Sequence, residues 1–220
     1  MEHPISQCRW PVALMAAFCI VGGLACAQGG DHSVDACLPD YEIYDAVIRS
    51  FVLGVAPVFP VHPPGSPPVT MVVIRDSTHL DDVSTALEPQ GRSKQQAYLL
   101  SRFGQAAAPL ITGLFQATSR NDIIPGCFRV NANVRLIADP EIDSLFEADD
   151  APGWKLFWNR YPTAQGILSL SSVAFDKDSS LALVYAGNDS GADAGKGLYI
   201  ILRRGEAGWT IEARVEVWVS

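Results

Sequence analysis

Histidine is rare in this sequence, and the spacings that build metal and nucleophile sites are missing. Its four histidines include no pair four residues apart on a helix, and none stands beside a cysteine. A zinc site of the usual histidine and thiolate type is therefore not expected. The chain also lacks the G-x-S-x-G turn that presents the nucleophile of α/β-hydrolases. We expect no cofactor.

Basic residues are outnumbered by acidic ones. The sequence has 16 lysines and arginines against 24 aspartates and glutamates, which gives a formal net charge of −8 at pH 7. Binding to nucleic acid or to anionic lipid headgroups requires basic surface patches. We therefore expect no nucleic-acid partner and no attachment to a membrane through surface charge.

No apolar run reaches the ~20 residues that a membrane-spanning helix needs. The longest run, residues 12–24, follows Arg9 and ends in small residues, as the core of a signal peptide does. The tripeptide A-C-A that ends at Ala27 fits the small-x-small rule for cleavage. Alternatively, the tripeptide L-A-C that ends at Cys26 is a degenerate lipobox, and Cys26 would then carry a lipid. We favour simple secretion over lipidation.

These features predict that the protein is exported. We expect residues 1–27 to be a signal peptide and residues 28–220 to form a single domain, periplasmic or secreted. Contact with a membrane would arise only through the signal peptide or through a lipid on Cys26.

Cysteine is scarce in the part of the chain that is expected to fold. Export would leave Cys37 and Cys127 in an oxidising compartment, where disulfides persist. The pair lacks the C-x-x-C spacing of redox-active dithiols. We predict a structural disulfide, which the chain-entropy model expects to stabilise the fold by about 4.5 kcal/mol.

The last third of the chain gives the strongest signal for the fold. Turn-rich spacers separate four strand-like runs, which are residues 166–175, 181–187, 197–204 and 209–220. Connections this short make neighbouring strands antiparallel. In the last run, alternation assigns five aliphatic residues to one face, namely Ile211, Ala213, Val215, Val217 and Val219. It assigns Trp218 to the opposite face, with the charged residues.

Earlier segments complete an α+β pattern. Residues 69–75 are dense in β-branched side chains, and residues 128–136 alternate apolar with polar, so both indicate strands. Helical spacing marks residues 40–53, 93–118, 141–147 and 153–161. A proline-rich loop occupies residues 56–68. We predict an antiparallel sheet, made of the C-terminal four-strand meander and one or two earlier strands, packed against N-terminal and middle helices.

Two local features of the helices follow from single residues. Asp40 is expected to cap the first helix. Pro109 is expected to break or kink the second, with Ala108 pushed out of the helical region of backbone space.

Several C-terminal motifs, taken together and in order, resemble a family of exported bacterial proteins and lipoproteins of unknown function. They are L-I-x-x-x-E-I-D-S-L-F, G-W-K-L-F-W-N-R-Y-P-T-A-Q-G-I-L-S-L-S-S-V-A-F-D-K-D, A-L-V-Y-A-G-N, G-K-G-L-Y-I-I-L and G-W-T-I…V-W-V-S. The resemblance covers Leu136 to Ser220 well and the upstream helices weakly, and it supplies no mechanism. Relatives tend to carry a basic residue where this chain has Ser172, and some carry cysteines in the segment N-D-S-G-A-D-A-G.

One polar cluster, D-S-T-H-L-D-D, offers candidate catalytic residues. His79 with Asp76, Asp81 or Asp82 would make a general base with an orienting carboxylate, and Ser77 would be the nucleophile. Polar clusters that follow a strand are more often solvated turns and helix caps. We favour that interpretation.

Aromatic residues form the most suggestive set of candidate binding residues. Trp154, Trp158 and Tyr161 lie along one short helical segment, and Trp218 lies in the last strand. Amphipathic rings line ligand grooves and anchor protein interfaces. The favoured alternative is that these rings form the core between helix and sheet.

The glycine-rich segment 187–197 is expected to be a hairpin loop. It matches neither a phosphate-binding P-loop nor an EF-hand. Asp189 and Asp193 are the candidate ligands of a looser calcium site.

The sequence thus favours a non-enzymatic envelope protein that binds an unknown protein or a small ligand through its aromatic residues. The alternative is a hydrolase-like enzyme that uses His79 with nearby aspartate and serine residues. A purely structural lipoprotein, which requires acylation of Cys26, is the third hypothesis.

Overall fold

The computed structural model describes residues 39–54, 68–79, 89–117, 122–147 and 153–220. Contacts divide the chain into two units, Met1–Ala36 and Cys37–Ser220. The first unit, with the predicted signal peptide and Cys26, lies outside the described residues, as does the proline-rich loop apart from Pro68. Among the helices that are described, none is long and apolar enough to cross a membrane.

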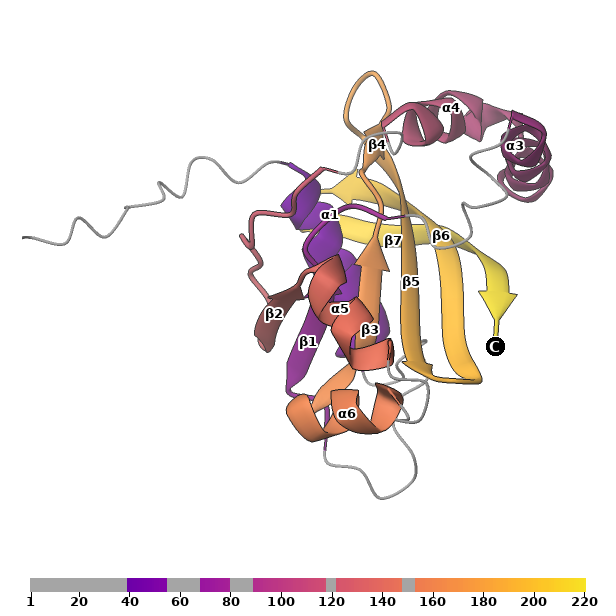
Figure 1. Ribbon diagram of the computed structural model, residues 1–220. Coiled ribbons are helices and arrows are strands. Elements are labelled where there is room, and N and C mark those ends of the chain that lie inside the picture. The colour runs from indigo at the N-terminus through magenta and orange to yellow at the C-terminus, as the bar shows by residue number, and fades with distance from the viewer. Residues whose placement is uncertain (1–38, 55–67, 80–88, 118–121, 148–152) are drawn as a thin grey trace, which may run out of the picture. The chain divides into compact units, whose positions relative to one another are not determined.

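Seven strands form one sheet (Figure 1). They are β1 (Met71–Arg75), β2 (Asn133–Ile137), β3 (Ala164–Leu170), β4 (Ala174–Phe175), β5 (Leu181–Gly191), β6 (Ala194–Gly205) and β7 (Gly208–Val219). The order across the sheet is β2-β1-β3-β5-β6-β7, and β4 pairs with β5. With the helices described below, this sheet confirms the predicted α+β fold.

The C-terminal strands form the antiparallel meander that their short connections predict. β3 pairs with β5, β5 with β6 and β6 with β7, each in antiparallel orientation. The first predicted run is divided into β3 and β4 at Ser171, whose N–H still donates to the carbonyl of Tyr185 at 3.0 Å but whose carbonyl does not receive the return bond. Its hydroxyl Oγ accepts a hydrogen bond from the backbone N–H of Tyr185 at 2.8 Å.

The two upstream strands join the sheet in parallel orientation. β1 pairs in parallel with both β2 and β3. The connections from β1 to β2 and from β2 to β3 both contain helices, which supply the length that a parallel crossover requires. The sheet is therefore mixed, with its parallel part at the β2 end.

The alternating segment 128–136 becomes a strand only in its second half. Residues 128–132 lie against the first helix, where the backbone N–H of Arg129 donates to both carboxylate oxygens of Asp45 at 3.0 and 3.1 Å. Phe128 packs edge-on against Tyr41, with ring centroids 5.1 Å apart. This stretch packs on α1 instead of extending the ladder, and β2 begins at Asn133.

The helices are α1 (Asp40–Val47), which continues directly as the π-helix η2 (Ile48–Val52), α3 (Pro89–Phe103), the short 3₁₀ helix η3 (Gln105–Ala107), α4 (Ala108–Ala117), α5 (Asp139–Phe146) and α6 (Gly153–Arg160). Asp40 does not cap α1 as predicted. It is the first helical residue, no side chain caps the helix, and the Asp40 carboxylate accepts the N–H of Val173.

The predicted break in the second helix occurs, but at a different residue. Gly104, which has a φ of 86°, ends the helical conformation between α3 and η3. Ala108 stays in the helical region at φ −54° and ψ −43°, contrary to the prediction. Pro109 lies in the first turn of α4, where its missing N–H removes no helical hydrogen bond.

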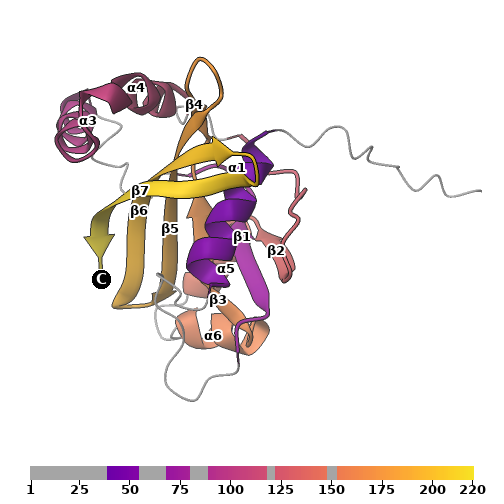
Figure 2. The ribbon, with the colours of Figure 1, turned by 180° about the vertical axis from the view of Figure 1, so that it is seen from behind.

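Helices cover both faces of the sheet. α1 and η2 lie on one face (Figure 2), and α3, α4, α5 and α6 lie on the other (Figure 1). The side chains of β5 divide between them. Ala182 and Val184 face α1, whereas Leu183 and Tyr185 face α4. This arrangement explains why the central strands are apolar on both faces.

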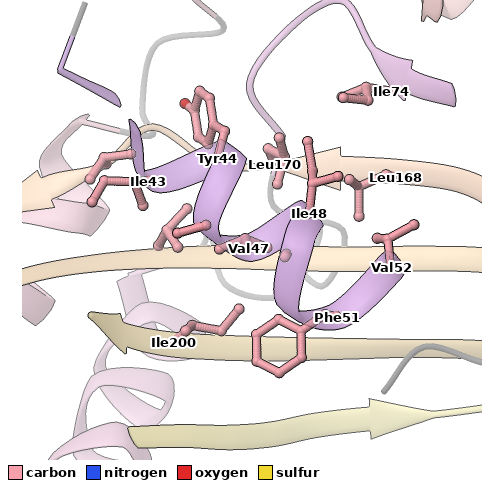
Figure 3. Packing of buried hydrophobic residues seen from close by; sticks show 14 of the residues in the cluster. Ile43, Tyr44, Val47, Ile48, Phe51, Val52, Ile74, Leu168, Leu170 and Ile200 are labelled. Atoms are coloured by element: carbon pink, nitrogen blue, oxygen red, sulfur yellow. The ribbon is translucent and has the colours of Figure 1, made fainter. Parts of the chain in front are cut away.

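α1 and η2 bury one apolar stripe against the sheet. The stripe consists of Ile43, Val47, Ile48, Phe51 and Val52, which pack on β3 and β6 (Figure 3). Burial of each large aliphatic side chain stabilises the fold by about 1.5–3 kcal/mol. The opposite side of the helix, with Glu42 and Arg49, is exposed and is held in position by this packing.

Cys127 lies in the segment that precedes β2. The partner predicted for it, Cys37, lies outside the described residues, so the pairing itself stays a prediction. Cys127 packs against the cluster formed by α1 and the sheet, in the segment that Arg129 fastens to Asp45.

Candidate functional site

The polar cluster that follows β1 is tied to its neighbours through the backbone. Thr78 N–H donates to the carbonyl of Asp122 at 2.8 Å, and His79 N–H donates to the carbonyl of Leu170 at 2.7 Å. Ser77 forms an isolated antiparallel bridge with Ile123. These contacts make the segment a structural link between β1, β3 and the loop before β2.

Of the predicted catalytic residues, the structure describes Asp76, Ser77 and His79. Nδ1 of His79 is buried and has no hydrogen-bond partner. Within the described residues, no hydrogen bond joins His79 to Asp76 or Ser77. Asp81, like Asp82, lies outside the described part of the chain. Among the described residues, no carboxylate is seen to orient His79, as a general base requires, and the catalytic hypothesis stays a prediction.

The hydroxyl groups of Ser171 and Tyr44, near this segment, form hydrogen bonds that hold the backbone in place. Ser171 Oγ donates to the carbonyl of Ser172 at 2.8 Å, and Tyr44 OH donates to the carbonyl of Ser171 at 2.9 Å. Burial raises the pKa of Tyr44 well above its ordinary value, because the phenolate would lose its hydration. Tyr44 thus stays a hydrogen-bond donor, and the network fastens α1 to the end of β3.

Two of the aromatic candidates, Trp154 and Trp158, lie in α6, and the third, Tyr161, follows its last residue. Tyr161 is buried, and its hydroxyl donates to Glu141 Oε1 at 2.7 Å. Trp154 and Trp158 are partly exposed and stack on each other with centroids 5.9 Å apart. Phe146 of α5 packs edge-on against Trp154 and is 38% exposed. We call Phe146, Trp154 and Trp158 the α6 aromatic surface.

Trp218 belongs to another part of the molecule, and alternation assigns it to the wrong face. Leu198 pairs with Glu216 and Gly197 with Trp218, so Val217 is an extra residue on β7. This β-bulge turns Trp218 toward the face that carries Val215. Its indole covers Gly197 and donates from Nε1 to Tyr185 OH at 2.8 Å. Trp218 is therefore a packed part of the sheet.

The candidate calcium ligands lie in a tight hairpin. β5 and β6 stay paired up to Gly191 and Ala194, so the turn contains only Ala192 and Asp193. The prediction of a hairpin loop over residues 187–197 is therefore wrong. Gly195 and Gly197 allow this pairing, because Trp218 occupies the space above them. In the described residues, no three histidine, cysteine, aspartate or glutamate side chains form a group that could hold a metal ion.

A pocket of about 630 Å³ lies beside α1. Three separate segments build its walls: the polar side of α1 and η2, Arg129 in the segment before β2, and the hairpin between β6 and β7. The charged side chains that line it are Glu42, Asp45, Arg49, Arg129, Arg204 and Glu206. We call this cavity the α1 pocket.

Aspartate 45 anchors one wall of the α1 pocket. Its side chain is buried, and both carboxylate oxygens accept the Arg129 N–H. Burial raises the pKa of Asp45, because the charged form loses hydration. The N–H of Arg129 and the guanidinium groups of Arg49 and Arg129 act in the opposite direction.

Tryptophan 209 anchors the opposite wall. Its indole N–H donates to Glu42 Oε2 at 3.1 Å, which joins the β6–β7 hairpin to α1. The Arg204 guanidinium lies over the Trp209 ring, 5.8 Å from its centroid, and Phe175 packs near the same ring at 5.9 Å. Arg49 reaches across to donate from Nη1 to the carbonyl of Arg129 at 3.1 Å.

The α1 pocket was not predicted from the sequence. The pocket arginines come from three distant segments, namely Arg49, Arg129 and Arg204. Within its own segment, each has the pattern of an ordinary surface residue. The signal available was weak. Trp209 stands beside a tight turn, where a large aromatic residue has little to pack against unless another element covers it.

The geometry defines the class of the protein as an α+β domain with a mixed sheet, helices on both faces and a charged pocket at one edge of α1. Comparison of the chain with protein-family models, with curated proteins and with solved structures finds no match.

Proposed function

We propose that the protein is an exported, non-enzymatic binding module that holds a small ligand in the α1 pocket. The observation that carries the proposal is the convergence of three segments, distant in sequence, on one charged cavity. Its volume of about 630 Å³ falls within the range of ~300–1,000 Å³ that small-molecule sites occupy.

The binding hypothesis is preferred because the described residues offer a charged pocket, whereas no hydrogen bond among them pairs a nucleophile with a base. His79 is the histidine of the candidate catalytic cluster, and its buried Nδ1 has no partner among the described residues. The α1 pocket contains no histidine, serine nucleophile with a base, or cysteine among its lining residues. Its charged groups suit recognition of a charged ligand.

Export is the second part of the proposal. The apolar run 12–24 after Arg9, followed by small residues, supports a signal peptide. The predicted disulfide between Cys37 and Cys127 would persist in the oxidising compartment that export implies.

A substitution that fills the pocket from its rim tests the proposal. Ala207 lines the pocket at the exposed tip of the β6–β7 hairpin. We expect native mass spectrometry of the protein isolated from its own cell envelope to detect a companion mass. Ala207→Trp should remove that mass, because the indole would occupy the cavity without disturbing the core.

Ala192→Trp is the matched control. Ala192 is equally exposed at the tip of the other hairpin, between β5 and β6, and does not line the pocket. This variant should keep the companion mass. A bare polypeptide from the wild type, or a companion mass that survives Ala207→Trp, would contradict the proposal.

The α6 aromatic surface supports a second candidate function, the binding of an apolar segment of a partner protein. The stacked Trp154 and Trp158 and the 38% exposed Phe146 form an aromatic patch of the kind that anchors interfaces. A companion mass that is lost in Trp158→Ala and kept in Ala207→Trp would favour this function over the first.

A further inference from the structure

We infer that the α1 pocket binds an oxyanion, the carboxylate or phosphate group of its ligand, through the guanidinium groups of Arg49, Arg129 and Arg204. The inference rests on the proposed function of this pocket and specifies the chemistry of the ligand. All three arginines line the cavity.

The three guanidinium groups have more N–H donors than the described residues use. A guanidinium carries five N–H donors in a fixed fork, which matches the paired oxygens of a carboxylate or phosphate. One hydrogen bond is present, from Arg49 to the carbonyl of Arg129. Within the described part of the chain, none of the three forms an ion pair with a carboxylate.

The neighbouring Arg203 provides a contrast within the same strand. Its guanidinium pairs with Glu212, with Nη2 2.8 Å from Oε1. Arg204, one residue further along β6, faces the pocket and lies over the Trp209 ring instead. Adjacent arginines thus differ in that one is neutralised within the sheet and the other is directed at the cavity.

The acidic residues of the pocket are largely engaged already. Both oxygens of Asp45 accept the Arg129 N–H, and Glu42 Oε2 accepts the Trp209 indole N–H. Glu206 stands exposed at the hairpin tip, at the mouth of the cavity. The acids therefore position the walls, and the guanidinium groups are left to meet a ligand.

The chemistry of the arginine side chain supports oxyanion binding by these residues more than a general role in the solubility of the protein. The three arginines share the pocket with the carboxylates of Glu42, Asp45 and Glu206, so the assignment rests on geometry and not on an excess of positive charge. All three arginines are exposed, so a ligand can reach them, and the planar fork of a guanidinium binds a carboxylate or phosphate through two parallel hydrogen bonds.

The test is a titration of the full exported chain, followed through the Trp209 indole N–H in ¹H–¹⁵N spectra. The probes are inorganic phosphate and acetate, added separately at constant ionic strength with chloride as the balance. We expect a saturable shift of the Trp209 signal with at least one probe. The probe that binds more tightly distinguishes a phosphate ligand from a carboxylate ligand.

Arg129→Gln should weaken that binding at least tenfold, whereas Arg203→Gln should leave it within twofold. Arg204→Gln provides a second pocket variant in case Arg129→Gln alters folding, and Arg129→Lys tests whether the fork geometry is needed beyond the charge. No saturable shift in the wild type, or equal weakening by Arg203→Gln, would overturn the inference. If neither anion binds while Ala207→Trp still removes the companion mass, the pocket is a binding site for another class of ligand.

Discussion

Gly195 and Gly197 determine where Trp218 lies. Each leaves open a space on the sheet that a side chain would fill, and the Trp218 indole covers both positions. From there its N–H reaches Tyr185 OH, a group on the central strand β5. The two glycines therefore connect the edge strand to the middle of the sheet through one aromatic ring.

Gly197→Ala should destabilise the fold by about 1–3 kcal/mol, the usual cost of overpacking. The new Cβ would overlap the Trp218 indole, which must move and give up its hydrogen bond to Tyr185. Urea unfolding measures the change, and the shift of the Trp218 indole N–H signal reports the movement of the ring.

Gly205→Ala serves as the control for this substitution. A Cβ at Gly205 would lie 3.7 Å from the carbonyl oxygen of Gly208, an ordinary contact. Its stability should stay within about 0.5 kcal/mol of wild type. Equal stability of the two variants would show that Trp218 moves without cost.

At the scale of elements, α1 carries a buried carboxyl whose ionisation opposes folding. Burial raises the pKa of Asp45 above its ordinary value of 3.8. The folded state then binds a proton that the unfolded state has released, so stability falls as pH rises above 3.8 through the folded pKa. Asp176, in the turn before β5, behaves in the opposite way, because the N–H of Leu181 lowers its pKa.

Asp45→Asn and Asp176→Asn should therefore change stability with opposite dependence on pH. We expect Asp45→Asn to gain on wild type as pH rises above 3.8, because the amide carries no charge to bury. The stability of Asp176→Asn relative to wild type should fall as pH rises toward 3.8 and stay lower above that pH. Urea unfolding at a series of pH values checks both.

Asp40, which is partly buried, does not affect this comparison. Its pKa is also raised by burial, but it is present in wild type and in both variants, so its effect cancels in the differences. A loss of stability of Asp45→Asn relative to wild type with rising pH would mean that its hydrogen bonds to Arg129 outweigh its burial.

The elements that sequence reasoning predicted well are those specified by local patterns. Short spacers fixed the antiparallel order of β3, β5, β6 and β7, and the helical spacing in residues 93–118 found α3 and α4. The failures depend on partners distant in sequence. The face of Trp218 depends on Gly197 opposite it, and the strand at 128–136 is shortened by Asp45 of α1.

At the scale of the whole molecule, the predicted aromatic site and the observed pocket differ for the same reason. Trp154, Trp158 and Tyr161 are close in sequence and could be grouped before any fold was known. The α1 pocket exists only because the β6–β7 hairpin and residue 129 meet the polar side of α1. The periodicity of one segment does not show which distant segments will contact it.

Export and the disulfide can be tested together on the mature protein. We expect an intact mass that corresponds to a chain beginning at Gln28, and a gain of two hydrogens when the Cys37–Cys127 pair is reduced. A lipid-bearing N-terminal Cys26 would instead identify a lipoprotein. A mass unchanged by reduction would contradict the predicted pairing.

The bulges of β7 also bear on how copies of this protein meet one another. β7 lies at one edge of the sheet, and its register shifts twice, between Gly197 and Leu198 and between Ile201 and Leu202 on its partner. An incoming strand cannot match an edge whose spacing changes along its length. The other edge, β2, is only five residues long. The molecule therefore resists growing into a continuous fibre when it is crowded.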